Sequence, residues 1–347
     1  MTLCGLLSLI PTSAAYATNN NPNENDILPI TSNSYYSDST TSYTINNSRA
    51  NPYTYWNQEN INNAISNRID ITTIKEDGSH ASTIENDITT TFQPTPPSAP
   101  EIPSARSGFD KDQSSKPTGL LLFSTDDGQG SCTASLINSS SKKLILTAAH
   151  CLHDGKNKNW HSNFMFAPNA APTGGSHQMY PGGTARVFTD WINKAELENE
   201  SIKSSDIPND IGFITINSSI LPSGTAELVK KYGGHGFGHS NLGNFDATII
   251  GYPADPGDNQ IPQSCTSKVT TVSPLNIGNI LQATDCSFKN ARGASGGPWL
   301  QLYNSSTGIG WANGLSSAAN EESQILYSPR FNDRTYKLYN DANKDGL

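Results

Sequence analysis

The chain has 347 residues, which is enough for one large β domain with additional material at one end. It carries 22 Lys and Arg against 31 Asp and Glu, a formal net charge of −9, and this balance argues against a basic surface for nucleic acid. No apolar run is long enough to span a bilayer.

Residues 1–17 are typical of a secretory signal peptide. An apolar run at residues 3–10 precedes the small-x-small sequence Ala15-Tyr16-Ala17, which is the pattern that signal peptidase cleaves. The Lys or Arg usual near the start of such a signal is missing, so a buried N-terminal strand remains the alternative. We therefore expect a secreted, extracellular protein that loses Cys4 on maturation.

Residues 18–112 are dominated by Asn, Ser and Thr, and residues 94–103 are rich in proline. Such a segment buries too little apolar surface to offset the entropy of ordering it, so we expect it to be largely disordered. The spacing of apolar residues within 53–74 predicts a short helix as the exception. We interpret the segment as a pro-segment removed on maturation, with a cut after Arg106, and a flexible surface stalk is the alternative.

A compact all-β domain is predicted over residues 113–347. Short β-prone runs alternate with turns rich in Gly, Pro, Asn and Ser, which is the pattern of a barrel or sandwich of short strands. The predicted strands are residues 119–123, 131–137, 143–147, 163–166, 185–188, 210–216, 246–250, 268–272, 280–284 and 308–315.

The domain is expected to close with a helix over residues 333–343, where Tyr336 and Tyr339 are spaced i, i+3. Residues 341–346 also resemble the start of a calcium-binding loop, but the bidentate glutamate that such a loop requires does not follow. We therefore interpret them as the end of the helix, with Gly346 as the stop.

One serine lies in a glycine-rich bend, Gly-Ala-Ser-Gly-Gly-Pro-Trp-Leu, at residues 293–300. Glycines on both sides allow positive φ and a close approach of a ligand to the main chain. The N–H groups of Gly293 and Ser295 can then point into one small space, as the stabilisation of an oxyanion requires. A Gly-Ser loop without chemistry is the alternative for this stretch on its own.

Two further motifs supply a base and a carboxylate. The sequence Leu-Thr-Ala-Ala-His-Cys at residues 146–151 ends a β-prone run in His150, and Asp210 opens the apolar run Asp-Ile-Gly-Phe-Ile at residues 210–214. A serine hydroxyl becomes a nucleophile when an imidazole takes its proton, and the imidazole needs a carboxylate to fix its tautomer. The chain therefore presents histidine, aspartate and serine in that order.

These three motifs, in this order, resemble the chymotrypsin/trypsin family of serine peptidases over roughly residues 113–343, with a pattern like that of secreted microbial trypsin-like and glutamyl-endopeptidase-like members. The resemblance implies two six-stranded antiparallel β-barrels with the site in the crevice between them, and a C-terminal helix. It implies that Ser295 is the nucleophile, that His150 is the general base and then the acid, and that Asp210 orients His150. The N–H groups of Gly293 and Ser295 would form the oxyanion hole.

Four cysteines remain once Cys4 is removed, and an even number in a secreted chain predicts disulfides with three alternative connectivities. The family resemblance implies the pairs Cys132–Cys151 and Cys265–Cys286. A metal site is the rival interpretation, but the chain has no Cys-x-x-Cys spacing. No metal and no cofactor are expected.

Two departures from animal trypsins concern activation and specificity. Ala294 stands where trypsin-like zymogens carry an aspartate that pairs with the newly freed N-terminus, so any zymogen control has to be steric, through the pro-segment. The position six before Ser295, acidic in trypsin, is Lys289, so Arg/Lys specificity does not follow. Lys289 or Arg292 would favour an acidic side chain just before the scissile bond, with Ser317 on another wall of that pocket.

The predicted activity is hydrolysis of peptide bonds in a polypeptide substrate, through an acyl-enzyme, by a monomer. A catalytically inactive protease-like module used for binding or adhesion is the main alternative. A secreted serine esterase is a weaker one, because its Gly-x-Ser-x-Gly turn belongs to an α/β chain with the histidine last. We interpret His153, His235 and His239 as non-catalytic, the last two as surface or loop residues.

Overall fold

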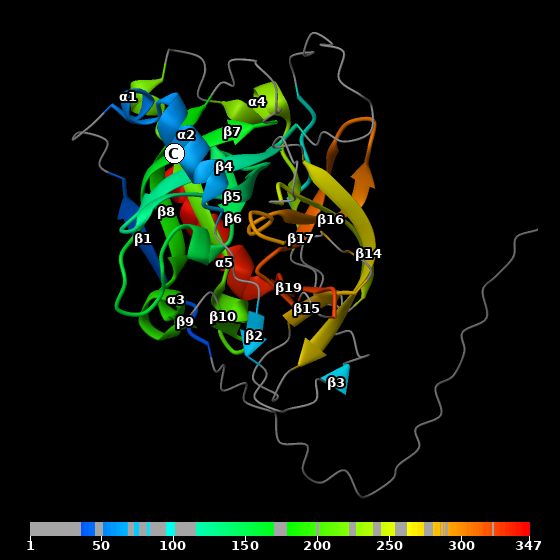
Figure 1. The fold of residues 1–347 in the computed structure, drawn as a ribbon. Helices are drawn as coiled ribbons and strands as arrows, with labels where there is room; N and C mark the ends of the chain where they lie inside the picture. The colour runs from blue at the N-terminus through cyan, green and yellow to red at the C-terminus, as the bar shows by residue number, and fades with distance from the viewer. Residues whose placement is uncertain are drawn as a thin grey trace, which may run out of the picture. The chain divides into compact units, whose positions relative to one another are not determined.

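The computed structural model of the chain is mostly β-strand, with few helices and one helix at the C-terminus (Figure 1). The structure describes residues 36–45, 51–68, 73–75, 82–83, 95–100, 116–169, 179–198, 201–221, 227–238, 244–253, 262–273, 280–284, 286, 288, 291–320 and 323–347. The expected signal peptide, Lys289 and His239 lie outside these residues. No helix within these ranges is long and apolar enough to cross a membrane.

Six antiparallel strands close into a first barrel, because each pairs with two neighbours and the last pairs with the first. In order around the barrel they are β4 (Thr118–Thr125), β5 (Gly128–Ile137), β6 (Leu144–Thr147), β11 (Gly212–Ile216), β8 (Tyr180–Phe188) and β7 (Ser162–Pro168). The interior is filled by apolar side chains such as Phe123, Leu136, Phe164 and Phe213, all completely buried.

A second set of six strands forms the other half of the domain. In order they are β16 (Pro298–Asn304), β13 (Phe245–Gly251), β14 (Gln263–Ser273), β15 (Ile280–Ala283), β19 (Ile325–Pro329) and β17 (Ile309–Leu315). β17 pairs with β16, and it also meets β19, because the N–H of Leu315 donates to Ser328 Oγ and that of Ser317 donates to the carbonyl of Tyr327, each at 2.9 Å. The expected all-β fold is confirmed, with the first barrel closed by strand pairing and the second set of six strands joined at its ends by these two hydrogen bonds.

Shorter elements join this framework. Strands β12 (Gly236–Phe237) and β18 (Ala318–Asn320) pair with β17 and β19, and β3 (Ser82–Thr83) pairs with β14. Strands β2 (Thr73–Lys75), β9 (Leu197–Glu198) and β10 (Ser201–Lys203) form a small sheet. Two short helices, α3 (Thr189–Lys194) and α4 (Leu228–Tyr232), lie between the strands in the sequence. All strands predicted from the sequence are found, with shifted ends, whereas β16, β19 and these shorter elements were not among the predicted strands.

The predicted closing helix is α5 (Asp333–Asp345), drawn in red in Figure 1. Asn332 and Thr335 form a capping box that satisfies the free N–H groups of its first turn. Its apolar side packs on β8 and β11, and the ring of Tyr339 stacks on that of Phe237 with centroids 4.8 Å apart. The helix thereby covers the first barrel.

The residues that resemble a calcium loop belong to this helix. Asp345 forms a two-point ion pair with Arg186 at 2.6 and 2.7 Å, and Asp341 pairs with Lys337 at 2.7 Å. Gly346 is the C-cap, as the interpretation of a helix end predicts.

Parts of residues 18–112 are ordered and pack on the first barrel. β1 (Thr40–Thr44) pairs with β8 over its whole length, and α1 (Pro52–Tyr55) and α2 (Gln58–Ser66), blue in Figure 1, follow it. Trp56, between the helices, is buried, and its Nε1 donates to the carbonyl of Asn163 at 2.6 Å. The short helix expected within residues 53–74 is present as α2. β1 differs from the expected disorder, because its pairing with β8 orders a stretch whose composition does not predict a strand.

Candidate active site

His150 and Asp210 meet because they follow and precede two paired strands. His150 lies in a single 3₁₀ turn, Ala149–Cys151, directly after β6, and Asp210 lies just before β11. These strands are antiparallel neighbours, with Gly212 opposite Thr147. The end of one strand and the start of the other therefore bring the two side chains to the same edge of the barrel.

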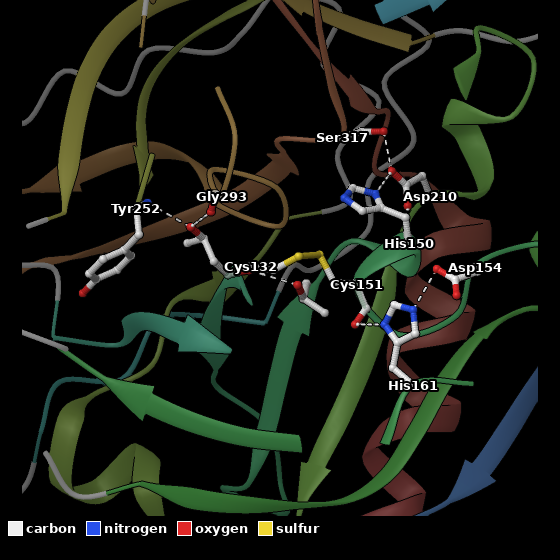
Figure 2. Close-up of a disulfide and its surroundings, with 11 residues drawn as sticks. Cys132, His150, Cys151, Asp154, His161, Asp210, Tyr252, Gly293 and Ser317 are labelled. Carbon is white, nitrogen blue, oxygen red and sulfur yellow. Dashed lines mark hydrogen bonds and ion pairs between the residues drawn. A yellow bond between two sulfur atoms is a disulfide. The ribbon is translucent and has the colours of Figure 1, made fainter. Parts of the chain in front are cut away.

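The carboxylate of Asp210 holds His150 at two points. Its Oδ2 lies 2.8 Å from His150 Nδ1, and its Oδ1 accepts the backbone N–H of His150 at 2.9 Å (Figure 2). Both residues are buried, with 1% of His150 and none of Asp210 exposed. An ionised carboxylate can only accept, so Nδ1 carries the proton and Nε2 is left as the basic nitrogen. Among the described residues Nε2 has no hydrogen-bond partner.

Ser317 makes a third contact with this carboxylate. Its hydroxyl donates to Asp210 Oδ2 at 2.6 Å, beside the bond from His150 (Figure 2). The sequence placed Ser317 only in a wall of the substrate pocket. The structure does put it in a recess beside Ser295, but its bond to Asp210 depends on the meeting of the two barrels, which no local motif reveals.

The serine bend is tight and needs its glycines. Gly293 and Gly296 both have φ of +80°, and a Cβ on Gly296 would lie 2.2 Å from Thr147 Oγ1. The N–H groups of Gly293 and Ser295, the expected oxyanion hole, donate to no acceptor within the described part of the chain. Donors left free in this way can receive the oxygen of a reacting carbonyl.

Ser295 and His150 are anchored to consecutive residues of β5. Cys132 forms the disulfide with Cys151, the neighbour of His150, and the N–H of Thr133 donates to the carbonyl of Ser295 at 2.8 Å. No hydrogen bond joins Ser295 to Nε2 of His150 among the described residues. Catalytic hydrogen bonds are often long in a free enzyme and shorten when substrate binds. The arrangement therefore supplies an oriented base beside the serine bend.

Both disulfides implied by the family resemblance, Cys132–Cys151 and Cys265–Cys286, are present. Ligand atoms of Cys132, His150 and Cys151 lie close together, as in a small metal site. Zinc binds cysteine as the thiolate, however, and these two sulfurs are bonded to each other. The group therefore anchors the histidine turn and does not fit a metal.

Two hollows flank the serine bend. A cavity of about 630 Å³ is lined by His150, Arg68, Gln129 and Arg292, among others. A small recess of about 10 Å³ lies beside Ser295. Its other lining residues are small or apolar: Ala291, Ala294, Ser316, Ser317, Ala318, Ala319 and Leu326. Arg292, expected beside an acidic substrate side chain, is thus found at the larger cavity and not in the recess.

The other described histidines are buried and structural. His235 is completely buried, with Nε2 at 3.1 Å from Thr118 Oγ1 and Nδ1 accepting the N–H of Gly310 at 3.3 Å. The interpretation of His235 as a surface residue is therefore wrong, because the glycine-rich stretch around it runs between packed strands. Burial lowers the pKa of His235 to about 3, and burial with the charge of His161 lowers that of His153 to about 4.

The sequence and the fold of the chain are both similar to those of known proteases. The sequence model of the trypsin family matches residues 106–335. The fold is similar to that of the protease Anisep from Arthrobacter nicotinovorans, with 23% identity and a TM-score of 0.54 over 68% of this chain and 98% of that one.

Two further solved structures are similar. The thermostable serine protease AL20 from an extremophilic microorganism has 23% identity and a TM-score of 0.51 over 66% of this chain and 98% of that one. A Glu endopeptidase has 15% identity and a TM-score of 0.49 over 76% of this chain and 100% of that one. Among curated proteins no significant match was found.

Proposed function

The chain belongs to the trypsin family of serine endopeptidases, and from this premise we propose that it hydrolyses peptide bonds through Ser295, His150 and Asp210. The observation that carries the proposal is the buried pair of His150 and Asp210, joined at 2.8 Å, whose Nε2 has no hydrogen-bond partner among the residues that the structure describes. A polypeptide is the substrate.

The proposed reaction has two halves. Ser295 Oγ attacks the carbonyl carbon of the scissile bond and gives its proton to Nε2 of His150, while the oxyanion is bound by the N–H groups of Gly293 and Ser295. The protonated His150 then gives this proton to the leaving amine, and the acyl-enzyme remains. In the second half, water attacks the ester carbonyl and gives its proton to Nε2 of His150. The acid product is released, and His150 returns the proton to Ser295 Oγ.

Asp210 supports the proposed cycle without exchanging a proton. It accepts hydrogen bonds from the backbone and Nδ1 of His150 and from Ser317, so its negative charge is fixed beside the imidazole. That charge favours the imidazolium formed in each half-reaction. Burial strengthens the interaction, since the local dielectric constant is lower than that of water.

We further propose that the protein is secreted as a precursor. The signal-like residues 1–17 and the two disulfides fit an oxidising compartment. Processing after Arg106 would cut the chain between residues 18–106 and the trypsin-like part, and the ordered residues 36–45 and 51–68 would stay packed on that part.

Labelling with a serine-directed fluorophosphonate tests the activity. The processed protein is expected to be labelled on Ser295, and the Ser295→Ala and His150→Ala variants are expected to remain unlabelled. Mass spectrometry gives the adduct position and the mature N-terminus in the same measurement. A folded, processed protein that takes no label would instead be the inactive, binding form of this fold.

A further inference from the structure

One buried threonine joins β5 to the serine bend. Thr133 is completely buried and follows Cys132 of the disulfide beside His150. Its backbone N–H donates to the carbonyl of Ser295, and its own carbonyl accepts the hydroxyl of Thr147 at 2.9 Å. The backbone of Thr133 thus fixes the position of the serine residue.

The side chain of Thr133 makes a different pair of contacts. Its hydroxyl donates to the carbonyl oxygen of Gly293 at 2.7 Å and accepts the N–H of Tyr252 at 2.9 Å. Gly293 and Tyr252 lie on the two sides of this bridge in Figure 2. A carbonyl can only accept and an N–H can only donate, so the directions of both hydrogen bonds are settled.

This bridge acts on the peptide that follows Gly293. The carbonyl of Gly293 and the N–H of Ala294 belong to one planar peptide unit. The N–H end is held by the carbonyl of Ala291 at 3.0 Å, and the carbonyl end is held by Thr133. The N–H of Gly293 belongs to the preceding peptide unit, which is joined to this one only through the Cα of Gly293. Gly293 has φ of +80° and no side chain to restrict it, so holding the following peptide limits the directions that this N–H can take.

We propose that Thr133 is a positioning residue for the oxyanion hole. Its hydroxyl holds Gly293 so that the N–H of Gly293 converges with that of Ser295. Ala294 offers no charged group that could anchor the bend, and the threonine hydroxyl does so with a neutral hydrogen bond. The inference rests on the proposed function, because it assigns Gly293 and Ser295 to the stabilisation of an oxyanion.

Loss of the Thr133 hydroxyl should displace Gly293 and not Tyr252, because Tyr252 has a second anchor. Arg68 Nη1 donates to the carbonyl of Tyr252 at 3.1 Å, so the Tyr252 loop keeps an anchor when the Thr133 hydroxyl is removed. The carbonyl of Gly293 then loses the bridge that joins it to β5.

The test compares three variants of the full processed protein. Thr133→Val removes the hydroxyl at nearly constant volume, and Thr133→Ser restores it. Thr215→Val is the matched control, since Thr215 is also buried on the first barrel and its hydroxyl accepts the N–H of Thr184 at 2.9 Å, away from the serine bend. Each variant is measured for kcat and KM on a fluorogenic peptide, for inhibition by a peptide aldehyde and by a product peptide, and for hydrogen exchange over residues 291–297.

For Thr133→Val we expect kcat to fall about 10- to 100-fold, less than the loss of a whole oxyanion donor, with KM within about threefold. The affinity of Thr133→Val for the aldehyde should fall by about the same factor as kcat, because the aldehyde adduct places an oxygen in the oxyanion hole. Its affinity for the product peptide should not change. Exchange over residues 291–297 rises. Thr133→Ser and Thr215→Val remain within about threefold of the unaltered protein in every assay.

Two results overturn the inference: a Thr133→Val protein with unchanged kcat, or a Thr215→Val protein that loses as much. If the unaltered protein cleaves no peptide and takes no label on Ser295, the proposed function fails separately. In that case hydrogen exchange by itself tests the positioning role of Thr133. Equal exchange over residues 291–297 in Thr133→Val and Thr215→Val would contradict that role.

Discussion

The hydroxyl of Ser317 lies 2.6 Å from Asp210 Oδ2, the same oxygen that receives Nδ1 of His150 at 2.8 Å. A hydrogen bond to a charged group contributes about 1.5–3 kcal/mol. We therefore expect Ser317→Ala to lower kcat by about 10- to 100-fold, because the carboxylate that orients His150 loses one of its donors. Ser316→Ala is the control, since Ser316 is also buried but accepts Nε1 of Trp299 and not a catalytic group. Equal kinetics for the two variants would contradict a role through Asp210.

The two disulfides close loops of similar length but hold different segments of the chain. They close loops with sequence separations of 19 and 21, each worth about 3 kcal/mol in the chain-entropy model. Replacing either pair by alanines should therefore lower the melting temperature by a similar amount, about 6–12 °C for a domain of this size.

Activity should separate the two disulfide variants. Only Cys132–Cys151 is adjacent to His150, so its loss should lower kcat well below that of the variant without Cys265–Cys286. The comparison is made at a temperature where circular dichroism shows both variants folded. Equal loss of kcat would mean that the first disulfide stabilises the barrel without positioning the histidine.

The ordered N-terminal part of the chain should remain attached to the enzyme after processing. β1 pairs with β8, and Trp56 is 3% exposed. After a cut at Arg106 we expect both pieces to elute together in gel filtration and to separate only in denaturant. Trp56→Ala should cost about 3–5 kcal/mol of unfolding free energy, and replacement of the exposed Tyr53 by alanine should cost little. A processed enzyme that has lost residues 36–68 and keeps its full stability would overturn this prediction.

The sequence predicted what depends on local pattern. Apolar runs located the main strands, and three motifs in a fixed order identified the family, because each of these features is a contiguous stretch of sequence. β1 was missed because its Thr-rich sequence resembles that of its surroundings and only pairing with β8 makes it a strand. The bonds of Ser317 and Thr133 were missed for a related reason, since each joins segments more than 100 residues apart.

Acid should destabilise the fold through His235. Its pKa is about 3 in the folded protein, lowered by burial from an ordinary 6.5, so between these pH values the unfolded chain binds more protons. The stability that neutral His235 contributes is present above pH 6.5 and is lost as the pH falls toward 3. Urea unfolding at a series of pH values should show a decline over this window, and the decline should be shallower in His235→Gln. An identical slope in both proteins would show that other groups control it.

The recess beside Ser295 predicts a preference for a small, uncharged residue just before the scissile bond. It measures about 10 Å³, close to the space that one water molecule needs, and its described walls include Ala319 and Leu326. Alanine or serine should therefore be cleaved faster than phenylalanine in matched peptides, and Leu326→Ala should improve cleavage after larger apolar residues. Arg292→Ala should leave this ranking unchanged, because Arg292 lines the larger cavity. A preference for glutamate would instead favour the role first inferred for Lys289, and its loss in Lys289→Ala would establish that residue as the determinant.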